Sequence, residues 1–108
     1  MKLMVMEKHE GEGAFPLFKK GTAVSNLKQD SEYPVYPHWY SCVIDGHDTY
    51  IPGIYVESGV LTRDYDPTEL IAEKGQRLTL ISVVFSWLYA KDENGNEGWI
   101  PASKVISV

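Results

Sequence analysis

Residues 87–105 read WLYAKDENGNEGWIPASKV, and an earlier stretch, residues 39–56, reads WYSCVIDGHDTYIPGIYV. Each stretch begins at a tryptophan and runs through short apolar segments on both sides of a turn. It ends on an Ile-Pro pair, three further residues and a valine. Asn94-Gly95 is the strongest short hairpin signal in the chain, because a type I′ turn needs positive φ at both central residues. The two stretches therefore predict the same β-hairpin twice, as an internal repeat.

The repeat extends upstream of both tryptophans. A Lys-Gly turn followed by a strand pattern stands at residues 20–24 and again at residues 74–78. Further upstream, short apolar runs occur at residues 3–6 and 60–63. Since aromatic and β-branched residues between turn formers are typical of strands, we expect two all-β units, residues 1–57 and residues 58–108.

Composition excludes several classes of protein. The 108 residues are 44% hydrophobic and 23% charged, which is ordinary for a globular chain and argues against disorder. A net charge of −5 disfavours binding to a nucleic-acid backbone, where lysines and arginines must displace counterions. The single cysteine excludes an internal disulfide and a cysteine-based zinc site.

The apolar segments are too short for a membrane span or a secretion signal. The most apolar window, residues 78–90, is interrupted by Thr79, Ser82 and Ser86 and is shorter than the roughly 20 residues that a spanning helix needs. Residues 1–6 contain only a brief apolar run. With a free cysteine besides, the sequence predicts a cytoplasmic protein that does not bind membranes.

The second unit resembles a Src homology 3 (SH3) domain. Residues 61–66, LTRDYD, stand where that family has its Ala-Leu-Tyr-Asp-Tyr strand, and Glu69-Leu70 follows in the RT loop. Lys74-Gly75-Gln76 matches the diverging turn, and Trp87 opens the strand after the n-Src loop. Residues 98–105, GWIPASKV, match the last hairpin strand and the 3₁₀ turn.

The first unit is more divergent. The pair of units resembles the small bacterial tandem SH3-like proteins described as ligand-binding, through Glu7-Lys8-His9, residues 37–42 (PHWYSC) and Asp45-Gly46. The resemblance implies an all-β fold of two tandem SH3-like five-stranded β-barrels, the first over residues 1–57 and the second over residues 58–108.

The resemblance also implies a ligand groove in each unit. An SH3 groove receives a preformed polyproline II segment between aromatic ridges, beside an acidic RT loop. In the second unit, the groove positions and their acidic flank are Tyr65, Trp87, Pro101, Asp66 and Glu69. In the first unit, the corresponding groove positions are Trp39, Pro52 and Tyr55.

Two groove positions of the second unit depart from the family. Arg63 stands where the first groove tyrosine belongs, and Lys104 stands where the tyrosine of the 3₁₀ turn belongs. Cations therefore replace two aromatic walls, which disfavours ordinary Pro-x-x-Pro binding by that groove. Pro34-Val35-Tyr36-Pro37 is itself a Pro-x-x-Pro segment, which either stiffens its loop or docks into a neighbouring chain.

No catalytic, metal or cofactor site emerges. His9, His38 and His47 have no metal-ligand spacing, and we expect all three at the surface or in turns. Cys42 lies in an apolar strand pattern and is expected to be a buried, inert thiol. Since no acid, base and nucleophile set is visible, the sequence predicts a protein that is not an enzyme.

The sequence favours a non-catalytic binding module. Aromatic grooves with acidic flanks predict a peptide or protein partner that is basic or contains proline. The alternative is a structural or assembly protein whose aromatic grooves are buried between repeats or subunits. Cell-wall binding is weaker, because no secretion signal is seen; the ligand, the open groove and self-association stay undecided at this point.

Overall fold

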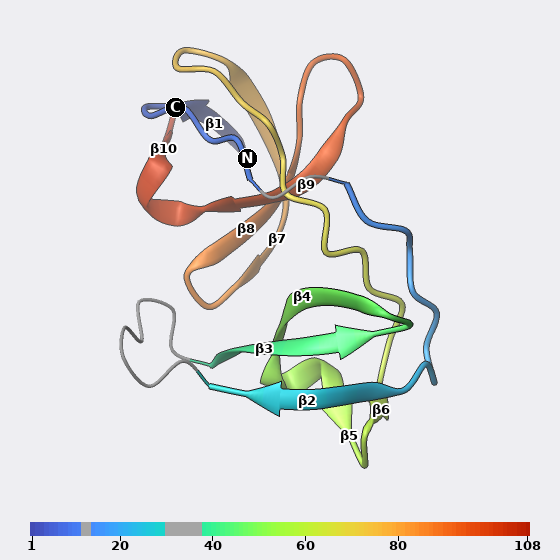
Figure 1. Ribbon diagram of the computed structural model, residues 1–108. Coiled ribbons are helices and arrows are strands. Elements are labelled where there is room, and N and C mark those ends of the chain that lie inside the picture. Colours follow the sequence, from blue (N-terminus) through green and yellow to red (C-terminus); the bar gives the residue numbers. More distant parts are fainter. Residues whose placement is uncertain (12–13, 30–37) are drawn as a thin grey trace. The chain divides into compact units, whose positions relative to one another are not determined.

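The computed structural model describes residues 1–11, 14–29 and 38–108 (Figure 1). This part of the chain is all-β, as predicted, with two single-turn 3₁₀ helices and no described helix long and apolar enough to cross a membrane. The elements in chain order are β1 (Lys2–Val5), β2 (Val24–Lys28), β3 (Trp39–Ile44), β4 (His47–Pro52), η1 (Gly53–Tyr55), β5 (Val56–Glu57), β6 (Val60–Leu61), β7 (Arg77–Val84), β8 (Trp87–Lys91), β9 (Glu97–Pro101), η2 (Ala102–Lys104) and β10 (Val105–Ser107).

The chain forms two units whose bounds differ from a division after residue 57. Unit 1 contains Met1–Phe15 together with Thr68–Val108, and unit 2 contains Pro16–Pro67. The difference has a direct cause in strand pairing: the N-terminal strand β1 hydrogen-bonds to β7 and β10 of the second repeat rather than to strands of the first.

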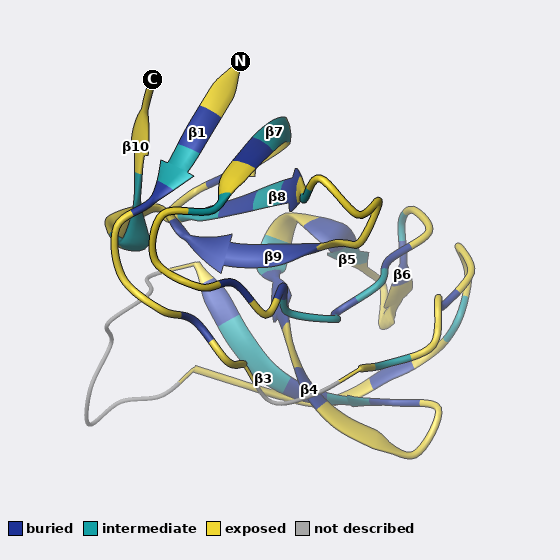
Figure 2. Ribbon diagram, turned by 90° about the horizontal axis from the view of Figure 1, so that it is seen from above, coloured by how far each residue is buried: buried dark blue, intermediate teal, exposed yellow. Residues whose placement is uncertain are grey.

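Unit 1 is a five-stranded sheet in the order β10-β1-β7-β8-β9. Strand β1 is interior to this sheet, with Leu3 opposite Leu78 on β7 and opposite Ser107 on β10. Figure 2 shows β9 buried along nearly its whole length. The core of unit 1 combines residues from both ends of the chain: Leu3, Val5, Leu70, Ala72, Leu78, Leu88, Ala90 and Ile100.

Unit 2 contains a three-stranded sheet in the order β2-β3-β4 and a two-stranded ribbon of β5 and β6. The β3–β4 hairpin closes with a two-residue turn, because Ile44 pairs with His47 across it. Asp45 and Gly46 both have positive φ, 48° and 79°, as a type I′ turn requires. The local sequence Asp-Gly therefore sets the register of this hairpin.

The β8–β9 hairpin is confirmed, but the type I′ turn predicted at Asn94-Gly95 is wrong. Gly95 has a φ of 90°, whereas Asn94 is not among the described residues with positive φ. The loop is wider than two residues: the Asp92 carboxylate accepts hydrogen bonds from the backbone N–H groups of Asn94 and Asn96, both at 2.9 Å. This side-chain cap competes successfully with the tighter turn.

The first strand of each predicted repeat pairs outside the residues predicted for that repeat, an arrangement called here the strand exchange. Strand β1 lies in the sheet of β7–β10, while β6 pairs with β5 in unit 2. The segments after these strands follow the same rule: His9 pairs with Ala72 in unit 1, and Tyr65 pairs with Phe18 in unit 2. The chain therefore passes between the units twice, after residue 15 and after residue 67.

Candidate functional site

The two units do not group the groove residues as the sequence predicts, because of the strand exchange. Glu69, Trp87 and Pro101 lie in unit 1. Tyr65 and Asp66, which the sequence groups with Trp87, lie in unit 2 instead. Unit 2 also holds the three predicted groove residues of the first repeat, which are Trp39, Pro52 and Tyr55.

Four positions correspond in the two units. Trp39 is the cross-strand partner of Pro52, and Trp87 is the partner of Pro101. A 3₁₀ turn follows each proline; it ends at Tyr55 in unit 2 and at Lys104 in unit 1. The fourth position lies in the exchanged segment, where Tyr65 of unit 2 corresponds to His9 of unit 1 through their equivalent bridges.

In unit 2 two of these positions, Tyr55 and Tyr65, form a packed aromatic pair. The rings of Tyr55 and Tyr65 meet edge to face with centroids 5.6 Å apart, and only 6% and 3% of the two residues is exposed. The Tyr65 hydroxyl donates a 2.6 Å hydrogen bond to the Tyr50 carbonyl, and the Arg63 guanidinium lies 4.8 Å from the centre of the Tyr55 ring. Burial raises the pKa of Tyr55 despite that nearby cation.

In unit 1 the corresponding positions form a polar array. His9 Nε2 lies 3.0 Å from Glu69 Oε1, and His9 Nδ1 lies 3.1 Å from Lys104 Nζ. An ammonium can only donate, so Nδ1 accepts from Lys104 and the imidazole N–H at Nε2 donates to the Glu69 carboxylate. The array is therefore a neutral imidazole between a carboxylate and an ammonium. His9 is 7% exposed, so its expected surface position is wrong.

Two glycines bring Glu69 to this array. The segment before Leu70 runs beside β9, where Leu70 N–H donates to the Trp99 carbonyl at 2.8 Å. A Cβ at Gly98 would lie 2.7 Å from the Leu70 nitrogen, and a Cβ at Gly11 would lie 2.5 Å from the Glu69 Cβ. Gly11 also has a φ of +66°. Any side chain at either position would therefore displace the Glu69 segment.

Trp87 borders the array. Its ring meets the His9 ring edge to face, with centroids 5.8 Å apart. Trp87 is partly exposed, whereas the corresponding Trp39 of unit 2 is 8% exposed. Unit 1 thus presents an indole with Pro101 opposite it and the His9 imidazole beside it.

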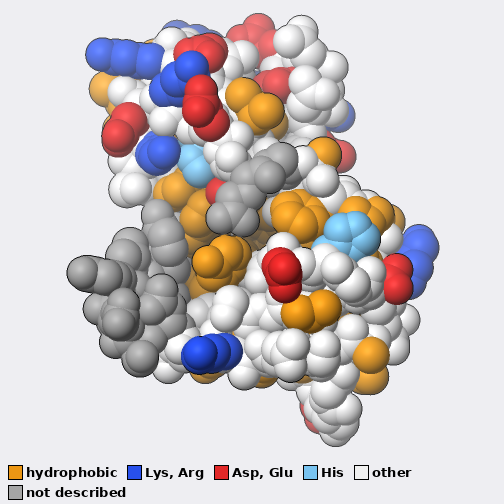
Figure 3. Space-filling view, viewed as in Figure 1, with side chains coloured by type: hydrophobic (Ala, Val, Ile, Leu, Met, Phe, Trp, Pro, Cys, Tyr) orange, Lys and Arg blue, Asp and Glu red, His pale blue; other side chains and the backbone are white. Residues whose placement is uncertain are grey.

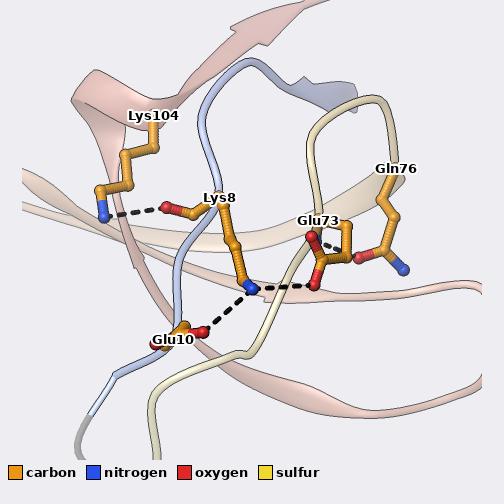
Figure 4. Close-up of polar contacts among 5 residues, drawn as sticks. All are labelled: Lys8, Glu10, Glu73, Gln76 and Lys104. Atoms are coloured by element: carbon orange, nitrogen blue, oxygen red, sulfur yellow. Dashed lines mark hydrogen bonds and ion pairs between the residues drawn. The ribbon is translucent and has the colours of Figure 1, made fainter.

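The lysine of the array is held by neutral acceptors. Besides His9, Lys104 Nζ donates to the Lys8 carbonyl at 3.2 Å (Figure 4). The Lys8 ammonium turns instead to Glu10 at 3.0 Å and Glu73 at 3.5 Å. Hydrogen bonding to Glu10, then the charges of Glu10 and Glu73, raise the pKa of Lys8. Within the described parts of the chain, no carboxylate forms an ion pair with Lys104.

Charge of one sign does not gather on the face seen in Figure 3. Acidic and basic side chains are interspersed there on each unit. The acidic flank expected from the sequence is also split, since Asp66 lies in unit 2 and Glu69 accepts a hydrogen bond from His9 in unit 1. An acidic groove for a basic ligand therefore gains little support from this arrangement.

The remaining candidates are Cys42, His38 and His47. Cys42 is buried, as expected, and burial raises the pKa of its thiol to about 11. His38 and His47 are exposed, as expected. Over residues 1–11, 14–29 and 38–108, no group of three or more His, Cys, Asp or Glu could hold a metal ion. The Pro34–Pro37 segment lies outside the described residues.

Comparison with models of known families, with curated proteins and with solved structures finds no match for this chain. Its function therefore has to be inferred from its own residues.

Proposed function

We propose that this chain is a non-catalytic binding module of two SH3-like units, which recognises a proline-containing peptide or protein segment through unit 1. The observation that carries the proposal is the contrast between two corresponding tryptophans. Trp87 is partly exposed beside Pro101 and His9, whereas Trp39 is buried at 8% exposure. A partly exposed indole opposite a proline is a suitable platform for a polyproline II segment.

The strand arrangement supports the SH3-like part of the proposal. Each unit has five described strands, which are β2–β6 in unit 2 and β1 with β7–β10 in unit 1. A 3₁₀ turn occurs in both, because η1 precedes β5 and η2 precedes β10. The order of elements therefore agrees with the tandem SH3-like architecture that the sequence resembles, with the first strand of each barrel supplied by the other repeat.

Proline is a better candidate than a basic residue as the recognised feature. In the SH3 mode, a basic ligand residue pairs with a free acidic side chain of the RT loop. Glu69 already accepts a hydrogen bond from His9, and Asp66 belongs to the other unit. A small site of this kind binds weakly, because little surface is buried to offset the entropy of association.

The alternative structural role is favoured for unit 2. Its tyrosine pair is closed by an edge-to-face contact, a buried hydroxyl hydrogen bond and a guanidinium over one ring. These contacts use the ring surfaces that a ligand would need. Trp39, Pro52, Tyr55 and Tyr65 therefore stabilise unit 2, and binding is assigned to unit 1.

A titration followed by amide and indole N–H resonances tests the proposal. The probe is a blocked peptide, Ac-Ala-Pro-Ala-Pro-Pro-Ala-NH₂, added to the isotope-labelled full chain. We expect the Trp87 indole resonance to shift with saturation while that of Trp39 stays in place. In Trp87→Ala the peptide should no longer shift any backbone amide resonance of unit 1, and Val83→Ala, an exposed position on β7, should leave the Trp87 indole shift unchanged. A Trp87 resonance that does not move would overturn the proposal.

A further inference from the structure

The Lys104 ammonium is held by two uncharged acceptors. An ammonium has three N–H donors. Lys104 uses two of them, on the Lys8 carbonyl at 3.2 Å and on His9 Nδ1 at 3.1 Å. Its third donor is therefore available to a ligand, and no ion pair with Lys104 forms among the described residues.

Three nearby carboxylates bind other groups. Glu69 takes the Nε2–H of His9, while Glu10 and Glu73 both bind the Lys8 ammonium. Lys104 is partly buried, so a charge pair at this position is screened less than one in bulk water. An anionic group there would add a hydrogen bond and a directly paired charge.

Unit 2 shows how the same position looks without this cation. There the residue is Tyr55, and the nearby cation, Arg63, rests on the tyrosine ring. Unit 1 places a cation directly at the end of its 3₁₀ turn and fixes it with His9, which Glu69 orients. The ammonium is thus preorganised next to the imidazole that borders Trp87.

From this geometry we infer that Lys104 makes the unit 1 site selective for a carboxylate, so that the recognised segment carries an acidic residue next to its proline. The inference rests on the proposed binding function. The ligand carboxylate accepts the third N–H of Lys104 in a charge-assisted hydrogen bond, while the proline lies on Trp87. His9 and Glu69 act as positioning residues, because they hold the ammonium without touching the ligand.

Two blocked peptides of the same size separate the charge from the shape. Ac-Ala-Pro-Pro-Glu-Ala-NH₂ and Ac-Ala-Pro-Pro-Gln-Ala-NH₂ are titrated into the full chain, with the Trp87 indole resonance as the signal. We expect the glutamate peptide to bind about fivefold to tenfold more tightly at low salt, as one partly exposed charged hydrogen bond allows. Salt at 0.5 M should reduce the preference, because it screens the pair.

Substitution of Lys104 identifies the residue responsible. Lys104→Gln should remove the preference and leave the affinity for the glutamine peptide unchanged. Lys104→Tyr, which introduces the residue that unit 2 has there, should also remove the preference. Lys91→Gln removes an exposed lysine of the same unit and should retain the preference.

The outcomes distinguish the inference from the function on which it rests. Equal affinity for the two peptides overturns carboxylate selectivity, and a preference that survives Lys104→Gln overturns its assignment to Lys104. In both cases a moving Trp87 resonance upholds the binding function. If neither peptide moves the Trp87 resonance, the binding function fails and carboxylate selectivity fails with it.

Discussion

Lys104 Nζ donates a hydrogen bond to His9 Nδ1 at 3.1 Å, although the two residues stand 95 positions apart in the chain. The contact exists because β1 joins the sheet of the second repeat and carries the segment around His9 with it. It replaces, in unit 1, the contact that Tyr55 makes with Tyr65 in unit 2. The same framework therefore supports a tyrosine pair in one unit and a charged array in the other.

The buried imidazole should contribute strongly to the stability of unit 1. His9→Ala removes a 7% exposed ring and leaves the hydrogen-bonding groups of Glu69 and Lys104 without their partner. We expect the free energy of unfolding to fall by about 2–4 kcal/mol, from the cavity and the lost hydrogen bonds. Urea denaturation measures the change. His47→Ala, at an exposed position, should change it by less than about 0.5 kcal/mol.

The strand exchange predicts reciprocal effects of two matched substitutions. Leu3 on β1 is 4% exposed and Leu61 on β6 is 1% exposed, so alanine at either position should cost about 2–5 kcal/mol. Hydrogen exchange should show the loss of protection mainly at residues 77–107 for Leu3→Ala and mainly at residues 24–29 and 38–57 for Leu61→Ala. The opposite assignment, with each leucine stabilising its own repeat, is the result that contradicts the exchange.

The hydroxyl of Tyr65 should contribute to unit 2 independently of its ring. Tyr65→Phe keeps the contact with Tyr55 and removes the 2.6 Å hydrogen bond to the Tyr50 carbonyl. We expect a loss of about 1 kcal/mol in thermal or urea unfolding, the usual size for one hydrogen bond. Tyr50→Phe serves as the control: that side chain is 50% exposed, and its backbone carbonyl is retained. A cost equal to that of the control would exclude the bond as a stabilising contact.

The β8–β9 loop should become less stable in acid. Burial raises the pKa of Asp92, but hydrogen bonds from Asn96, Asn94 and Gly95 outweigh burial, and the net pKa is lowered. A lowered pKa in the folded state means that the carboxylate stabilises the fold above its unfolded pKa, near 4, and that this contribution is lost as the pH falls below that value. Asp92→Ala should therefore be less stable than the wild type at pH 6 by about 1 kcal/mol, with the gap narrowing towards pH 2.

If the stability difference between Asp92→Ala and the wild type stays constant from pH 6 to pH 2, ionisation of Asp92 does not contribute to the stability of the fold. The matched control is Glu93→Ala, because Glu93 is exposed in the same loop. Its stability difference from the wild type should be small throughout that pH range.

Local sequence predicted the strands and the hairpins well. Aromatic and β-branched runs between turn formers identified β3–β4 and β8–β9, and the resemblance to SH3 domains indicated a 3₁₀ turn after each Ile-Pro pair. Such patterns depend only on residues close in sequence, so they predict a strand correctly whichever other strand it pairs with. The turn at Asn94-Gly95 was mispredicted because the Asp92 side chain, two residues upstream, offers the backbone another set of hydrogen bonds.

The site itself could not be predicted in the same way. Strands β1 and β6 begin repeats of the same pattern, and nothing in a short apolar run such as Leu3–Val5 specifies which sheet it joins. The exchange puts Tyr65 in unit 2 and His9 beside Trp87 in unit 1. Lys104 was noticed as a departure from the family, but its partner His9 was not, because pairing over 95 positions leaves no local signal.

The most direct test of this account is the proton–proton nuclear Overhauser contact made by the Trp87 indole, because the exchange decides which residue borders it. We predict cross-peaks between the Trp87 ring and the His9 ring, and between the Tyr65 ring and the Tyr55 ring. Absence of the cross-peaks between Trp87 and His9, and of those between Tyr65 and Tyr55, would contradict the exchange and with it the binding site of unit 1.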